Sequence, residues 1–169
     1  MKRNTIMVVT AAAAVLAACA AMPPGPSSVA VGDRQAQVQA KLGAPKLERK
    51  LASGATAWYF PTGPSGFYTW RVVFDPAGVA TEYGQVLTAK NFASFAQGAP
   101  PDALLDRLGP PMERMTFALS KTEAWTYRWM DGTLEMIADA VFDPGGLRHI
   151  ALYRDPAFSS TVSGDGSTK

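Results

Sequence analysis

The chain has 169 residues, of which 47% are hydrophobic and 18% are charged, and its 16 basic and 14 acidic residues give a net charge of +2. Lys2 and Arg3 account for this excess, so the chain from residue 19 onward is neutral. Nucleic-acid binding requires a stripe of cations that neutralises phosphates, and a neutral chain argues against it. Cys19 is the only cysteine, so no disulfide can form within the chain.

Residues 1–18 have the three parts of a secretory signal peptide. Lys2 and Arg3 form a basic start, residues 6–18 are uncharged and mostly apolar, and small residues precede Cys19. The apolar run is thirteen residues long, whereas a membrane-spanning helix needs about 20. We therefore expect these residues to be removed as a signal peptide.

The four residues at the end of this segment, Leu16, Ala17, Ala18 and Cys19, resemble the bacterial lipobox. In bacterial lipoproteins the cysteine is acylated and the chain is cut before it, so the resemblance implies lipidation of Cys19. Two or more acyl chains anchor a protein stably in a membrane, whereas one binds only marginally. An ordinary signal-peptide cut near Cys19 is the alternative. By analogy with enteric lipoproteins, Ala20 favours the outer membrane, with the protein facing the periplasm.

Beyond the signal peptide, the composition predicts a spacer followed by one sequence unit written twice. Residues 19–28 contain three prolines, a glycine and no charge, which is typical of an extended linker. Residues 29–87 and 88–156 then share a pattern, at an offset that grows only from 66 to 68 residues. The matched positions are Val38, Leu42, Gly43, Pro45, Trp58 and residues 73–78 in the first unit, and Leu104, Leu108, Gly109, Pro111, Trp125 and residues 141–146 in the second. The pattern predicts a duplicated structural unit.

In the first unit, the spacing of Val38 and Leu42 predicts a short helix that ends at Gly43, with Asp33 as a candidate cap. Strands are predicted over residues 46–51, 56–60, 68–74 and 79–85 from β-branched and aromatic residues and from period-2 alternation. In the second unit, helices are predicted over residues 88–96 and up to Gly109, with Pro100 or Pro101 in the first turn. The corresponding strands are residues 113–119, 122–130, 134–142 and 147–154.

These elements predict an α+β protein of two tandem repeats, each with one or two short helices packed on a three- to four-stranded antiparallel meander. An Asp-Pro-x-Gly turn precedes the last strand of each repeat. A unit of about 60 residues is marginally stable alone, so we expect the two halves to pack on each other. Residues 157–169 are rich in Ser, Thr and Gly and are predicted to be a disordered tail.

The combined pattern resembles the BamE-like (SmpA/OmlA) lipoprotein domain, over both repeats and about residues 29–155. It consists of Gly-x5-Val/Leu-x3-Leu-Gly-x-Pro, a strand containing Trp, and Val-Phe-Asp-x-x-Gly. The resemblance implies a helix pair on a three-stranded antiparallel sheet, and BamE itself belongs to a machine that assembles outer-membrane barrels. The β-lactamase-inhibitor protein fold is similar and is also a tandem repeat.

The residues that carry chemistry predict no catalytic site, no metal site and no cofactor. His149 is the only histidine, and we expect a structural role for it in the last strand, on the same face as Leu147 and Ala151. Nucleophilic triads and metal sites need clustered groups, which the sequence does not supply. Asp102 and Asp106 lie one helical turn apart, and a solvated helix face is the preferred interpretation.

The aromatic residues Trp125, Tyr127 and Trp129 share one face of a predicted strand. The first two match Trp58 and Phe60 in the first repeat, so core packing is expected for them. Trp129 has no counterpart in the first repeat and is therefore the candidate for an exposed contact with a partner.

The sequence favours a lipid-anchored outer-membrane lipoprotein that acts by protein–protein contact, as an outer-membrane assembly or cell-envelope accessory. The alternative is an inhibitor or binding module for a periplasmic or secreted enzyme. We expect neither an enzyme, nor a small-molecule substrate, nor nucleic-acid binding.

Overall fold

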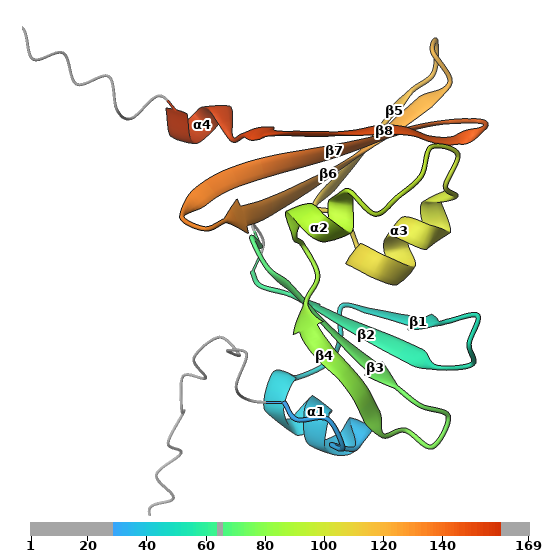
Figure 1. Ribbon diagram of the computed structural model, residues 1–169, viewed down its shortest axis with the longest axis vertical. Coiled ribbons are helices and arrows are strands. Elements are labelled where there is room, and N and C mark those ends of the chain that lie inside the picture. Colours follow the sequence, from blue (N-terminus) through green and yellow to red (C-terminus); the bar gives the residue numbers. More distant parts are fainter. Residues whose placement is uncertain (1–28, 64–65, 160–169) are drawn as a thin grey trace, which may run out of the picture.

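The computed structural model describes residues 29–63 and 66–159, which form two four-stranded antiparallel sheets and a few short helices (Figure 1). Sheet 1 consists, in spatial order, of β1 (Leu47–Lys50), β2 (Thr56–Pro61), β3 (Thr69–Phe74) and β4 (Ala80–Gln85). Sheet 2 consists of β5 (Glu113–Phe117), β6 (Thr122–Asp131), β7 (Leu134–Asp143) and β8 (Gly146–Arg154). The helices are α1 (Gln35–Leu42), α2 (Ala89–Phe92), α3 (Pro101–Leu108) and α4 (Pro156–Ser159). The predicted α+β class with antiparallel meanders is confirmed.

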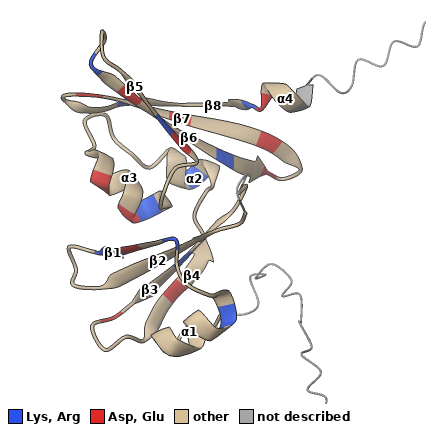
Figure 2. Ribbon diagram, turned by 180° about the vertical axis from the view of Figure 1, so that it is seen from behind, with Lys and Arg blue, Asp and Glu red and all other residues tan. Residues whose placement is uncertain are grey.

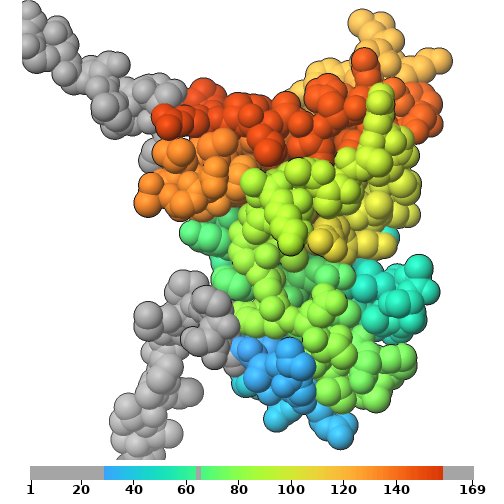
Figure 3. All heavy atoms as spheres, in the orientation of Figure 1, coloured from blue at the N-terminus to red at the C-terminus, as the bar shows by residue number. Residues whose placement is uncertain are grey.

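Helices and sheets alternate in layers through the molecule. Helix α1 covers one face of sheet 1, and α2 and α3 lie between the two sheets (Figure 1). Figure 3 shows the yellow-green segment that contains α2 and α3 filling this space. Helix α3 contacts both sheets, because its Asp106 bonds to Tyr59 of sheet 1 while Leu104 and Leu108 pack on sheet 2.

The core beneath α1 is built from the aromatic face of sheet 1. Val38 of α1 is fully buried against a cluster that includes Trp58, Phe60 and Phe74. The ring of Trp58 lies 4.8 Å from that of Phe74 in an edge-to-face arrangement, which adds to the burial energy of the two rings. The prediction that Trp58 and Phe60 belong to the core is confirmed.

The second core lies between the helix pair and sheet 2. Leu104 and Leu108 of α3 are fully buried against Trp125 and Tyr127, as their helical spacing predicts. Burying a leucine side chain is worth about 1.5–3 kcal/mol, so these two leucines fix α3 on the sheet. Pro100 caps the helix and Pro101 is its first residue, as expected.

Helix α1 begins differently from the expectation. Arg34, not Asp33, is the N-cap residue, and the Arg34 amide donates a hydrogen bond of 2.7 Å to Oε1 of Gln37. The Asp33 carboxylate instead accepts hydrogen bonds from the Ala30 amide at 2.8 Å and from the Lys41 ammonium at 2.6 Å. These two groups, the amide first, hold the pKa of Asp33 below its usual value.

Two further boundaries differ from the sequence prediction. Helix α2 begins after Thr88, whose hydroxyl accepts a hydrogen bond from the Asn91 amide, but ends at Phe92 instead of continuing to residue 96. The Ser94 hydroxyl donates to the Asn91 carbonyl at 2.7 Å and so occupies an acceptor at the end of the helix. The predicted tail begins too early, because α4 extends to Ser159. Its start is held by the Asp155 carboxylate, which accepts the Ala157 amide at 3.0 Å.

Each sheet carries a β-bulge at the same place in its pattern. The register shifts between Val73 and Phe74 in sheet 1 and between Val141 and Phe142 in sheet 2. In sheet 2 the shift places Leu147 opposite the core residue Phe142, and His149 opposite Val141 on the other face. The expectation that His149 shares a face with Leu147 is therefore wrong, because the extra residue of a bulge reverses the alternation.

The two halves pack on each other, as expected from their size. The face of sheet 1 opposite α1 carries Tyr59, which is fully buried and donates a hydrogen bond of 2.5 Å to the Asp106 carbonyl of α3. On β1, Arg49 binds the Asp106 carboxylate at 2.6 Å and the Asp102 carboxylate at 3.2 Å. Figure 2 marks the charged positions on β1 and α3 that face each other across this contact. Asp102 and Asp106 are thus ion-pair partners that join the halves, not a merely solvated helix face.

Candidate functional site

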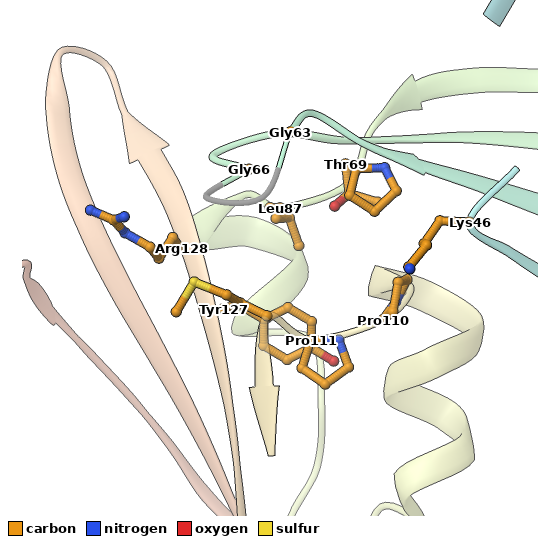
Figure 4. Close-up of a pocket in the computed structure, with 11 residues that line it drawn as sticks. Lys46, Gly63, Gly66, Thr69, Leu87, Pro110, Pro111, Tyr127 and Arg128 are labelled. Atoms are coloured by element: carbon orange, nitrogen blue, oxygen red, sulfur yellow. The ribbon is translucent and has the colours of Figure 1, made fainter. Parts of the chain in front are cut away.

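A groove of about 430 Å³ lies where the two halves meet (Figure 4). The first half supplies Lys46, Pro61, Gly63, Gly66 and Thr69 to its lining. The second half supplies Pro110, Pro111, Met112, Tyr127 and Arg128, and Leu87, the last residue of the first half, completes the lining. The prolines and Leu87 make this lining largely apolar, and the cationic side chains lie at opposite ends of it (Figure 4).

The polar groups of this groove are mostly engaged by neighbours. The Arg128 guanidinium binds the Asp155 carboxylate at 2.6 Å and the Glu135 carboxylate at 3.5 Å. Burial raises the pKa of Tyr127 well above its usual value, and its hydroxyl donates to the Gly109 carbonyl at 3.3 Å. Tyr127 therefore stays protonated at neutral pH and cannot act as a base. The lining suits an apolar ligand better than acid–base chemistry.

The other residues that bear on chemistry are dispersed over the molecule. His149 is exposed on β8, on the face of sheet 2 away from the helices. Among residues 29–63 and 66–159, no group of three His, Cys, Asp or Glu side chains is arranged to hold a metal ion.

Trp129, the predicted partner contact, is buried, with only 2% of its surface exposed. Its ring lies 5.5 Å from that of Phe92 in α2. The prediction of an exposed anchor is wrong because α2 folds over this end of β6. The first half has no described helix in that position, so matching the two repeats gave no sign of this cover.

Three exposed apolar side chains lie on the opposite side of the same sheet, Met115 and Phe117 on edge strand β5 and Tyr153 on edge strand β8. Met115 is 48% exposed, Phe117 44% and Tyr153 41%. Cross-strand pairing places Met115 opposite Ala124, and Ala124 opposite Val141. We call this the open face of sheet 2: the face of β5–β8 that points away from α2 and α3 and carries these five residues.

No helix of the described chain lies on the open face of sheet 2 (Figure 1). Strand β5 is exposed along its whole length, and the β5–β6 hairpin projects beyond the rest of the sheet (Figure 3). At the tip of this hairpin Leu119 is fully exposed. Alternating Met115, Phe117 and Leu119 were a sequence signal for such a surface, but the alternation did not say which face would stay uncovered.

The predicted lipidation site, Leu16 to Cys19, lies outside the described residues, as does the predicted linker. Within the described part of the chain, no helix is long and apolar enough to cross a membrane.

Comparison with known proteins gives little further information. No family model matches the chain, and no curated protein matches it. One solved structure, a DUF4309 family protein (YjgB) from Bacillus subtilis subsp. subtilis str. 168, has a TM-score of 0.28 and 16% sequence identity. That match covers 72% of this chain and 78% of the other. A TM-score this low does not show a shared fold, so the match carries no argument about function.

Proposed function

We propose that the protein is a lipid-anchored outer-membrane lipoprotein that faces the periplasm and acts by protein–protein contact, as an assembly or cell-envelope accessory. The lipobox-like residues Leu16 to Cys19 support the anchor. The observation that carries the contact function is the open face of sheet 2, with Met115, Phe117 and Tyr153 each more than two-fifths exposed. Met115 and Phe117 are neighbours on the same face of β5, and neighbouring exposed apolar side chains are typical of an interaction surface.

We further propose that the two halves are tandem copies of a BamE-like unit. The same strand order in both sheets and the bulges at Val73/Phe74 and Val141/Phe142 support this duplication. Gly43 and Gly109 also end α1 and α3 with nearly identical backbone angles. In such a duplication, the face of sheet 1 that points away from its own helix packs on the second copy, whereas the corresponding face of sheet 2 stays uncovered.

Two experiments test the proposal. Labelled palmitate should be incorporated into the wild-type protein in growing bacteria and not into Cys19→Ser, and labelling retained in Cys19→Ser contradicts the anchor. A photoreactive residue in place of Met115 should crosslink to a cell-envelope assembly protein in intact membranes. The same residue in place of Met112, which is equally exposed but lines the groove, is the matched control. Equal crosslinking from both positions contradicts a contact through the open face.

The second candidate function is inhibition of a periplasmic or secreted enzyme. It is favoured by the β5–β6 hairpin, which presents a fully exposed Leu119 beside Lys121, the one described non-glycine residue with a positive φ, +53°. A projecting hairpin with an apolar tip fits an enzyme cleft. Crosslinking of position 119 to a single hydrolase would support this function, with Leu119→Asp abolishing the crosslinked complex. Crosslinking to assembly proteins through position 115 alone would exclude it.

A further inference from the structure

The two sheets present the same cross-strand rows on the faces that point away from their own helices. In sheet 1, one row consists of Arg49, Ala57 and Val73 on adjacent strands. In sheet 2, the row at the same position consists of Met115, Ala124 and Val141. Cross-strand neighbours on one face of a sheet lie about 4.5–5.5 Å apart, so each row forms a short contact line.

The row in sheet 1 is already occupied by a helix. Arg49 binds two carboxylates of α3, and Ala57 and Val73 are buried at 0% and 5% exposure. Sheet 1 therefore shows how this kind of face receives a helix: apolar residues under the helix and a charged residue beside it. No described residue of the chain covers the matching row of sheet 2 in this way, and Met115 remains 48% exposed.

The charges of the two faces have opposite sign. The row next to the first consists of Leu47, Tyr59 and Arg71 in sheet 1. In sheet 2 it consists of Glu113, Thr126 and Asp139. Sheet 1 thus meets the acidic helix α3 with Arg49, and Arg71 on the same face pairs with Glu82 of its own sheet, whereas sheet 2 offers carboxylates in this row.

These carboxylates are available to a basic partner. Neither Glu113 nor Asp139 forms an ion pair with a described residue, and Asp139 accepts hydrogen bonds only from the hydroxyls of Thr126 at 2.7 Å and Tyr153 at 2.5 Å. Arg128 lies on this same face of β6, alternating with Thr126, and its guanidinium is already paired with Asp155 and Glu135.

We propose that the open face of sheet 2 binds an amphipathic helix of a partner protein, with its apolar stripe over Met115, Ala124 and Val141 and its Lys or Arg side chains on Glu113 and Asp139. The two carboxylates lie two strands apart, about 10 Å. Basic residues two turns apart on a helix are separated by about 10.8 Å and so reach both, and the length of Lys and Arg side chains allows a one-turn spacing to do the same. This inference rests on the proposed contact function and names the surface and the chemistry of the partner.

A second copy of the chain is a poorer occupant. The outward side of α1 carries exposed Ala36, Gln37, Gln39 and Ala40, none of them large and apolar, and α3 already packs between the sheets. The partner helix must therefore bring its own leucine-like stripe, which points to a different protein.

The test uses two stapled, fluorescein-labelled peptides that copy α3, because a free helix this short is marginal in water. One peptide keeps the native aspartates, and the other carries Asp102→Lys and Asp106→Lys. The target is the chain from residue 19 with Cys19→Ser, and fluorescence anisotropy gives the Kd. The lysine peptide should bind at least about tenfold more tightly, because it exchanges two repulsive charge pairs for two attractive ones.

Variants of the target locate the site. Met115→Ser should weaken binding of the lysine peptide more than about tenfold, whereas Met112→Ser, which alters the groove, should leave it unchanged. Glu113→Lys leaves one carboxylate and one cation on the face and should therefore abolish the preference between the two peptides. Equal binding of both peptides, equal effects at Met115 and Met112, or a concentration-dependent dimer that buries the face would overturn the proposal. Because the target carries no acyl groups, these outcomes are independent of whether Cys19 is an anchor.

Discussion

The packing of the two halves is tested most sharply by alanine substitution at two matched glycines. Gly43 and Gly109 follow α1 and α3 with φ and ψ of 80° and −164° and of 81° and −163°. A Cβ at Gly43 meets no atom within 4 Å, whereas a Cβ at Gly109 would lie 2.6 Å from Cδ1 of Tyr59 in the other half. Backbone strain is thus the same at both positions, and only the clash between the halves differs.

The expected losses of stability follow from these two terms. An alanine in this glycine-favoured backbone region costs about 1–3 kcal/mol, and both variants carry this cost. Overpacking against a buried side chain adds about 1–3 kcal/mol. Tyr59 cannot easily move aside, because it is fully buried and its hydroxyl is bonded to the Asp106 carbonyl. Gly109→Ala should therefore lose about 1–3 kcal/mol more than Gly43→Ala.

Urea unfolding followed by tryptophan fluorescence measures both free energies of unfolding, and amide exchange in β2 reports whether the contact between the halves has loosened. Gly109→Ala should speed exchange in β2, and Gly43→Ala should not. Equal losses for the two variants, with unchanged exchange in β2, would refute the packing of Tyr59 on Gly109.

Two other predictions concern charge and pH. Arg49→Met should lower the free energy of unfolding by about 1 kcal/mol, the value of a partly exposed ion pair. Lys46→Met breaks no described ion pair and should leave the free energy of unfolding unchanged. Equal losses for the two variants would contradict the role of Arg49. Partial desolvation of its hydroxyl, together with the hydrogen bond to the Asp139 carboxylate, raises the pKa of Tyr153 from 10.0 to about 12. Its contribution to stability is therefore full below pH 10 and is lost as the pH rises toward 12. Tyr153→Phe should flatten the fall of stability over that interval, and an unchanged profile would contradict the hydrogen bond to Asp139.

The sequence was informative wherever local pattern alone decides structure. Val38, Leu104 and Leu108 are buried as their helical spacing predicts, and Trp58 and Trp125 lie in the cores as their strand pattern predicts. These residues face the element that follows or precedes them in the chain, so the periodicity of one segment is sufficient to assign them.

The sequence was uninformative where the outcome depends on segments far apart in the chain. Trp129 is covered by Phe92 of α2, and Arg49 pairs with a helix more than fifty residues away. His149 lies on a different face from Leu147 because of a β-bulge, which the residues of this strand do not predict. The sequence does not reveal the open face of sheet 2 either, because Met115 and Arg49 occupy the same position in their strands. Only the arrangement of the halves leaves one covered and the other exposed.

The anchor on which the proposed function depends is tested most directly by intact mass spectrometry of the protein extracted from bacterial membranes. The protein should begin at Cys19 and carry the additional mass of acyl groups on that residue. A chain that begins elsewhere, or an unmodified Cys19, would contradict the anchor.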